Sequence, residues 1–173
     1  PLPEWANTAL AKLDMPHWTL NPVSMKLDNG ITLIVQPTSV SKTVTVAGHI
    51  DHDANLQEPA GKDGVGRLLA SLFDYGTATL DRTAFHKALD EIAATESAGD
   101  DFGLAVPTVG FDRGMQLLAD NELRPALPEP AFAVQQKPLS RSLAGEMQSP
   151  QYKMMHALTG GLLPAGDPGL REA

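Results

Sequence analysis

The chain has no cysteine among its 173 residues. A disulfide framework and a zinc site built from thiolates are therefore both excluded. The absence does not decide the cellular compartment, because many exported bacterial proteins also lack cysteine. The lack of cysteine therefore leaves the localisation open.

The sequence also lacks a long apolar run and a concentrated basic segment. Without about 20 consecutive apolar residues no transmembrane helix is expected. The net charge of −8 and the isoelectric point near 4.9 disfavour nucleic acid and anionic membranes as partners, because both attract clustered Lys and Arg. No signal peptide is recognisable and the first residue is Pro1, so we expect a soluble piece of a longer chain.

What is present is an ordinary apolar fraction of 42% in a chain long enough for one domain with a substantial core. Residues 1–22 are rich in proline and contain a short helical pattern. They fit either an interdomain connector or an N-terminal helix followed by an extended arm. Residues 23–173 then form the domain itself.

Hydrophobic periodicity predicts strands first, and then helices with a strand pair between them. A two-residue Asn29-Gly30 turn indicates a hairpin, and Asp81 and Ser149 are suitable helix N-caps. The expected elements are a hairpin over 25–36, a strand over 41–51, a helix over 64–77, a helix from Asp81, strands over 95–97 and 101–109, a helix capped by Asp112 and ending before Arg124, a helix over 128–147, and a helix from Ser149 to Leu158 closed by Gly160-Gly161. This order predicts an α+β fold with helices on one face of a mostly antiparallel sheet.

The stretch from Gly64 to Thr77 carries two helical faces. One is an apolar stripe that should dock the helix on the sheet; it consists of Val65, Leu68, Leu69, Leu72 and Phe73. The other holds Arg67, Ala70 and Ser71 at positions i, i+3 and i+4. These three residues decide whether the helix can do chemistry.

The stretch resembles the helix of the insulinase/pitrilysin zinc metallopeptidases, which carries an inverted His-x-x-Glu-His motif. Aligned without a gap, Arg67 and Ser71 fall on the two metal-binding histidines and Ala70 falls on the general-base glutamate. A permanently charged guanidinium repels a dication, and alanine cannot accept a proton from a bound water. The third metal-binding glutamate of the family best matches Glu146. The resemblance therefore implies a degenerate motif, with no catalytic residue and no metal or other cofactor site in this segment.

The resemblance covers residues 25–150 and is greatest to the third, motif-less domain of long bacterial members. It implies the half-domain fold of mitochondrial processing peptidase and related metallohydrolases. It also implies a non-catalytic domain that encloses a peptide substrate, with zinc and the active site elsewhere in the parent chain or on a catalytic partner subunit, and a periplasmic location. The alternative is a non-proteolytic assembly module derived from the same fold.

Other residues could carry chemistry on their own. The run from His49 to Asp53 contains two histidines and two aspartates, which suits either a metal site or an edge strand and loop. His86 and His156 fit surface or partly packed positions. Arg67 either pairs with Glu146 across two helices or is solvated, and the sequence leaves both alternatives open.

Overall fold

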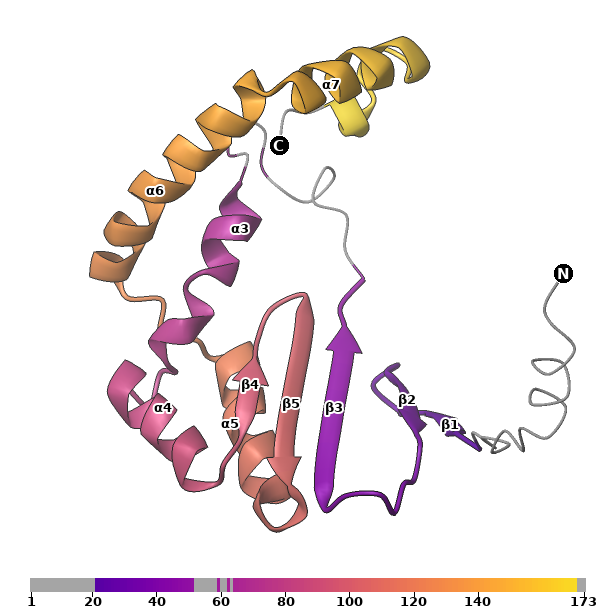
Figure 1. The fold of residues 1–173 in the computed structure, drawn as a ribbon, viewed down its shortest axis with the longest axis vertical. Coiled ribbons are helices and arrows are strands. Elements are labelled where there is room, and N and C mark those ends of the chain that lie inside the picture. Colours follow the sequence, from indigo (N-terminus) through magenta and orange to yellow (C-terminus); the bar gives the residue numbers. More distant parts are fainter. Residues whose placement is uncertain (1–20, 52–58, 60–61, 63, 171–173) are drawn as a thin grey trace, which may run out of the picture. The chain divides into compact units, whose positions relative to one another are not determined.

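The structure is a computed structural model that describes residues 21–51, 59, 62 and 64–170 (Figure 1). The chain divides into two compact units, Pro1–Ser41 and Lys42–Ala173. The connector or helix expected over residues 1–22 lies almost entirely outside the described residues, and so do His52 and Asp53.

The first unit contains the predicted hairpin. Strands β1 (Val23–Lys26) and β2 (Thr32–Val35) pair antiparallel. The turn was expected to have two residues, but it has three, 28–30: the Leu27 N–H donates to the Ile31 carbonyl, and the Gly30 N–H donates to the Leu27 carbonyl. Gly30 has φ +91°, so the loop is a tight turn followed by a left-handed residue, which glycine adopts without strain.

The second unit contains a three-stranded antiparallel sheet in the order β3-β5-β4. Its strands are β3 (Thr43–His49), β4 (Thr95–Ser97) and β5 (Asp101–Pro107). The expected single sheet is thus two sheets, one in each unit. Strand β5 ends two residues before the predicted position, because the 3₁₀ turn η2 (Thr108–Gly110) follows and the Thr108 N–H bonds the Lys42 carbonyl.

Helices α4 (Arg82–Glu91) and α5 (Phe111–Leu123) bury the apolar face of this sheet. The core consists of Phe85, Leu89, Leu104, Val106, Leu117 and Leu118. The Asp81 carboxylate accepts a hydrogen bond from the Ala84 N–H at 2.8 Å, so the predicted cap is confirmed. The predicted Asp112 cap is wrong: α5 continues directly from η2 with Gly110 at the N-cap, and Asp112 lies in the first helical turn. The α+β class with helices on one face is confirmed.

Helix α3 (Val65–Ala70) is much shorter than the predicted helix over 64–77. After Ala70 the backbone tightens, because the N–H groups of Leu72 and Tyr75 bond carbonyls three residues earlier and form the 3₁₀ turn η1 (Phe73–Tyr75). Gly76 then adopts φ +95°, and a Cβ at this position would collide with the backbone of the following turn. The chain therefore leaves the helical path before Thr77.

Helices α6 (Glu129–Gln148) and α7 (Pro150–Leu162) complete the second unit, followed by the 3₁₀ turn η3 (Pro168–Leu170). The Ser149 hydroxyl accepts from the Tyr152 N–H at 3.1 Å, which confirms the predicted cap of α7. This helix runs through Gly160-Gly161 instead of ending before them, since glycine weakens a helix without forbidding it. None of the helices in the described part of the chain is long and apolar enough to cross a membrane.

Candidate functional site at the Arg67–Glu146 pair

The first turn of α3 lies against α6 (Figure 1). Gly64 begins this contact with φ +83°, and a Cβ at this position would lie 2.7 Å from the Leu143 Cδ1 atom. Of the predicted apolar stripe, Leu68 and Leu72 are buried, whereas Val65 and Leu69 are 41% and 42% exposed. The prediction that the whole stripe docks on the sheet is therefore wrong, because α3 packs chiefly on α6.

Arg67 and Glu146 face each other across these two helices. The guanidinium donates two hydrogen bonds, from Nη1 to Oε2 at 2.9 Å and from Nη2 to Oε1 at 3.1 Å. The hydrogen bond from Arg67 lowers the pKa of Glu146, and the same bond raises the pKa of Arg67. The structure thus shows the paired alternative for Arg67, in the bidentate geometry typical of an arginine and a carboxylate.

The other two motif residues, Ala70 and Ser71, lie in different surroundings. The Ser71 hydroxyl donates to the Leu68 carbonyl at 2.7 Å, so it is held by its own helix. Ala70 lines a separate cavity on the sheet side. Arginine, alanine and this serine do not supply the imidazole or carboxylate donors that zinc takes, so the residues present do not fit a zinc ion. Within the described ranges, no group of three or more His, Asp or Glu side chains is arranged to hold a metal.

The histidines outside the motif are held in three different ways. His49, at the end of β3, lies with its Nδ1 2.8 Å from an Asp101 carboxylate oxygen, and both side chains are largely exposed. Because His52 and Asp53 lie outside the described residues, the metal hypothesis for this run stays untested. The Nε2 atom of His86 lies 3.0 Å from an Asp74 carboxylate oxygen, and His156 stacks on Tyr152.

Sequence reasoning did not single out Glu96 and Asn121. Asn121 continues the apolar stripe of α5 at i+7 from Gly114, after Leu117 and Leu118, and it is 1% exposed. An asparagine in the apolar stripe of a helix is a detectable signal for a buried polar contact. Its amide Nδ2 donates to Glu96 Oε1 at 3.2 Å.

The chain matches no family model and no curated protein. Its fold is similar to solved peptidase structures, at identities below 20%. A peptidase M16 inactive domain from Pseudomonas fluorescens has a TM-score of 0.69 at 16% identity, over 88% of this chain and 38% of that one. The periplasmic protease PqqL from Escherichia coli has a TM-score of 0.68 at 17% identity, and the match covers 90% of this chain and 18% of that one.

A protease from Helicobacter pylori has a TM-score of 0.57 at 19% identity, over 78% of this chain and 33% of that one. The chain thus spans less than two fifths of the length of each of these three proteins. The likenesses show that it has the fold of a peptidase M16 domain. They confirm the resemblance read from the sequence at the level of the fold.

Proposed function

We propose that this chain is a non-catalytic domain that helps to enclose a peptide substrate in a larger zinc-dependent peptidase. The active site would lie elsewhere, in the same polypeptide or on a catalytic partner subunit. The observation that carries the proposal is the Arg67–Glu146 pair. It occupies the two helices on which the resemblance would otherwise place the metal ligands, and it engages the one remaining carboxylate with a guanidinium.

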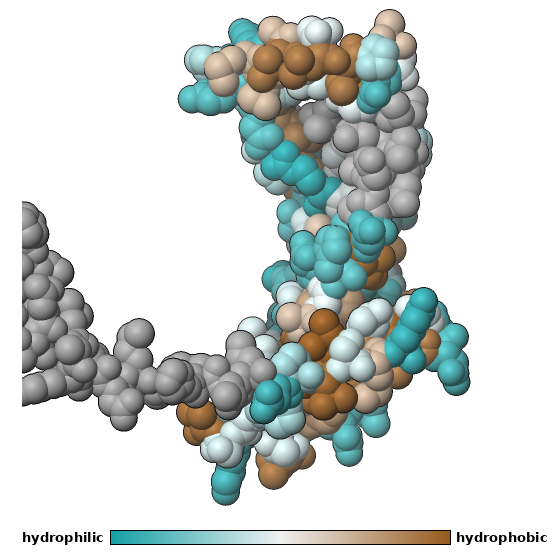
Figure 2. All heavy atoms as spheres, turned by 90° about the vertical axis from the view of Figure 1, so that its right-hand side faces the viewer, coloured by the Kyte–Doolittle hydropathy of each residue, from teal (hydrophilic) through white to brown (hydrophobic). Residues whose placement is uncertain are grey.

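Two further features support a role within a larger assembly. The apolar side chains of α7 gather on its exposed surface (Figure 2). Met154, Met155, Leu158 and Leu162 are between 52% and 73% exposed. Exposed apolar surface on this scale is typical of contact areas between proteins or domains. The Pseudomonas structure with a similar fold is itself named an inactive domain.

The first test is a peptidase assay on the purified chain with an unstructured peptide, with added zinc and with a chelator. We expect no cleavage above the background, because no residue at the motif positions can bind zinc or act as its general base. The complete protein, assayed in parallel, serves as the positive control. Chelator-sensitive cleavage by the chain alone would contradict the proposal.

The second test concerns enclosure. The complete protein, inactivated by a chelator, is mixed with an unstructured peptide that carries a photo-crosslinking group. We expect crosslinks to residues of this chain, whereas a small folded protein with the same group should give none because it cannot enter a chamber. If the peptide labels only other parts of the protein, the enclosing role is wrong. If no polypeptide with an intact His-x-x-Glu-His helix accompanies the chain, the assembly module is favoured instead.

A further inference from the structure

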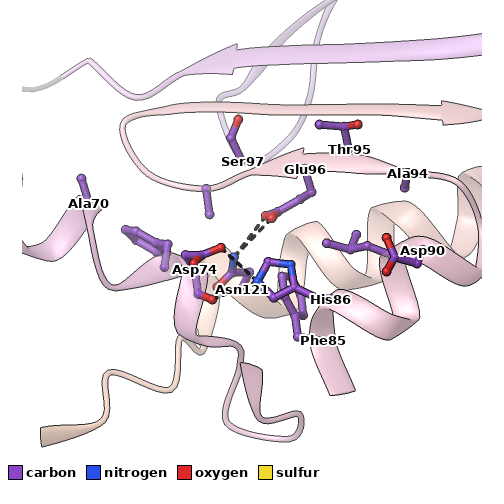
Figure 3. Close-up of a pocket in the computed structure, with 13 residues that line it drawn as sticks. Ala70, Asp74, Phe85, His86, Asp90, Ala94, Thr95, Glu96, Ser97 and Asn121 are labelled. Atoms are coloured by element: carbon purple, nitrogen blue, oxygen red, sulfur yellow. Dashed lines mark hydrogen bonds and ion pairs between the residues drawn. The ribbon is translucent and has the colours of Figure 1, made fainter. Parts of the chain in front are cut away.

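A cavity of about 380 Å³ lies among α3, η1, α4, β4 and α5 of the second unit (Figure 3). We call it the Glu96 cavity. Phe73 and Leu89 contribute to its apolar wall, and Glu96, Asn121 and His86 to its polar wall. Neither Arg67 nor Glu146 lines it, so it is separate from the site described above.

Glu96 is the inward-facing residue of β4. It lies opposite Leu104 in the register of the sheet, whereas its neighbours Thr95 and Ser97 face the exposed side. Figure 3 shows its carboxylate pointing toward Asn121, whose Nδ2 lies 3.2 Å and 3.5 Å from the two carboxylate oxygens. Burial raises the pKa of Glu96 to about 7, and the hydrogen bond from the Asn121 amide offsets only part of this rise. The Glu96 carboxylate has thus lost part of its hydration, and the uncharged Asn121 amide is the hydrogen-bond donor that faces it.

The charges around the cavity do not compensate this carboxylate. Asp74 and Asp90 line the cavity together with Glu96, and no Lys or Arg is among the lining residues. The nearby Arg82 guanidinium pairs with the Asp74 carboxylate, and the His86 Nε2 atom lies 3.0 Å from the same carboxylate. The wall is therefore rich in hydrogen-bond acceptors and carries an excess of negative charge.

Asn121 also carries an acceptor that is itself buried. Its side chain is buried, and its Oδ1 has no hydrogen-bond partner among the described residues. A half-turn of the amide exchanges Nδ2 and Oδ1, so the side chain can donate to a bare carboxylate or accept from a bound ligand. A ligand that brings several N–H donors would satisfy both Glu96 and this oxygen.

We propose that the Glu96 cavity binds a cationic alkyl group, a guanidinium or a primary ammonium. Its N–H donors would contact the Glu96 carboxylate and, after the half-turn of the Asn121 amide, the Asn121 oxygen, and its aliphatic stem would lie against Phe73 and Leu89. Anions do not fit, because three carboxylates line the cavity. The inference does not depend on the proposed function, since it uses no residue of the Arg67–Glu146 pair.

The test titrates the chain with N-acetyl-arginine amide and, as a matched neutral ligand, N-acetyl-citrulline amide at pH 8, by calorimetry or by chemical-shift mapping. We expect arginine amide to bind about ten-fold or more tightly than citrulline amide, as for a charge-assisted hydrogen bond in a partly buried site. Glu96→Gln should lower the affinity for arginine amide to a similar degree. Glu91→Gln, the same change on the exposed end of α4, should leave it unaltered.

The affinity should also fall with pH below about 7, because a protonated Glu96 no longer attracts the cation. The charged groups that face Glu96 are Asp74, His86, Asp90 and Glu122. Glu96→Gln should therefore flatten the pH profile of the affinity.

A peptide with one arginine between glycines distinguishes a peptide source from a free guanidinium compound: tighter binding of the peptide favours the former, and equal or weaker binding the latter. Ala70→Leu, which narrows the cavity without a change of charge, should weaken binding even if Glu96→Gln impairs folding. No binding at millimolar ligand would overturn the proposal, as would equal binding of citrulline amide. An unchanged affinity in Glu96→Gln would overturn it as well.

Discussion

Replacing Glu96 with glutamine should stabilise the chain at alkaline pH and change its stability much less in mild acid. The pKa of this carboxyl rises from 4.5 to about 7 in the folded protein, chiefly through burial. Between these two values the native state binds more protons than the unfolded state, so the free energy of unfolding falls as the pH rises. Above about pH 7 the decrease in the free energy of unfolding is complete and no longer changes with pH. Glutamine has no such proton, and its amide oxygen can accept the hydrogen bond that Asn121 Nδ2 donates to Glu96.

The magnitude follows from the size of the pKa change. One pKa unit corresponds to about 1.4 kcal/mol, so the rise from 4.5 to about 7 sets an upper limit of about 3.5 kcal/mol. Solvent reaches part of the carboxylate and screens it, which reduces the expected gain to about 1–2 kcal/mol at pH 8. For a chain of this length, the melting temperature should rise by roughly 2–8 °C.

The assay compares urea unfolding of the wild type and Glu96→Gln at pH 5 and pH 8, without added cationic ligand. Glu91→Gln provides the control, because this glutamate is 65% exposed and forms a long surface pair with Lys87 at i+4. Its effect should be under about 0.5 kcal/mol at both pH values. A wild-type stability equal to that of Glu96→Gln at pH 8 would refute the reasoning, and so would a difference that grows toward acid.

Three further predictions concern packing and the α3–α6 pair. Gly48→Ala should destabilise the chain by about 1–3 kcal/mol, because a Cβ at this position overlaps the Phe102 ring on the paired strand. Gly145→Ala makes the same change in α6, where no atom lies within 4 Å of the added Cβ, so it should instead stabilise the chain by about 0.5–1 kcal/mol. Thermal unfolding measures both effects. A loss of stability in Gly145→Ala would contradict the packing of α6. Arg67→Ala and Glu146→Ala should each destabilise the chain at neutral pH, and their effects should not add. Denaturant titrations over a pH series should show the coupling vanish as the pH falls through the lowered pKa of Glu146, whereas additive effects at neutral pH would mean that the pair contributes nothing.

The sequence was most informative where one local interaction decides the structure. Asp81 and Ser149 cap their helices as predicted, because a side-chain acceptor at an N-cap needs only the first turn of its own helix. The alternation along β3 was also readable, because it repeats with the period of a strand. The Arg67–Glu146 pair could be proposed only as one of two alternatives, since its geometry depends on how α3 and α6 pack.

Features that depend on tertiary packing were not readable from local pattern. The apolar period predicts too long a helix at α3, because the period continues through Leu72 and Phe73 while the backbone tightens toward Gly76. Gly160-Gly161 was assigned to the end of α7 on intrinsic preference alone, although the helix passes through it. The Glu96 cavity is not predictable from the sequence, because its residues come from five elements far apart in the chain and Asn121 alone gives a signal within its own helix.

The positions that hold α3 in place are distinct from those that would carry chemistry. Leu68 and Leu72 are buried, and Gly64 and Gly76 have positive φ, so these four residues determine how the segment packs and turns. Arg67 and Ala70 lie at exposed positions of the same segment, where a substitution removes little packing. Substitutions at Arg67 and Ala70 can therefore change the chemistry of the segment while the buried set preserves its packing. A fold read from buried periodicity accordingly says nothing about activity, which has to be argued from the exposed positions one residue at a time.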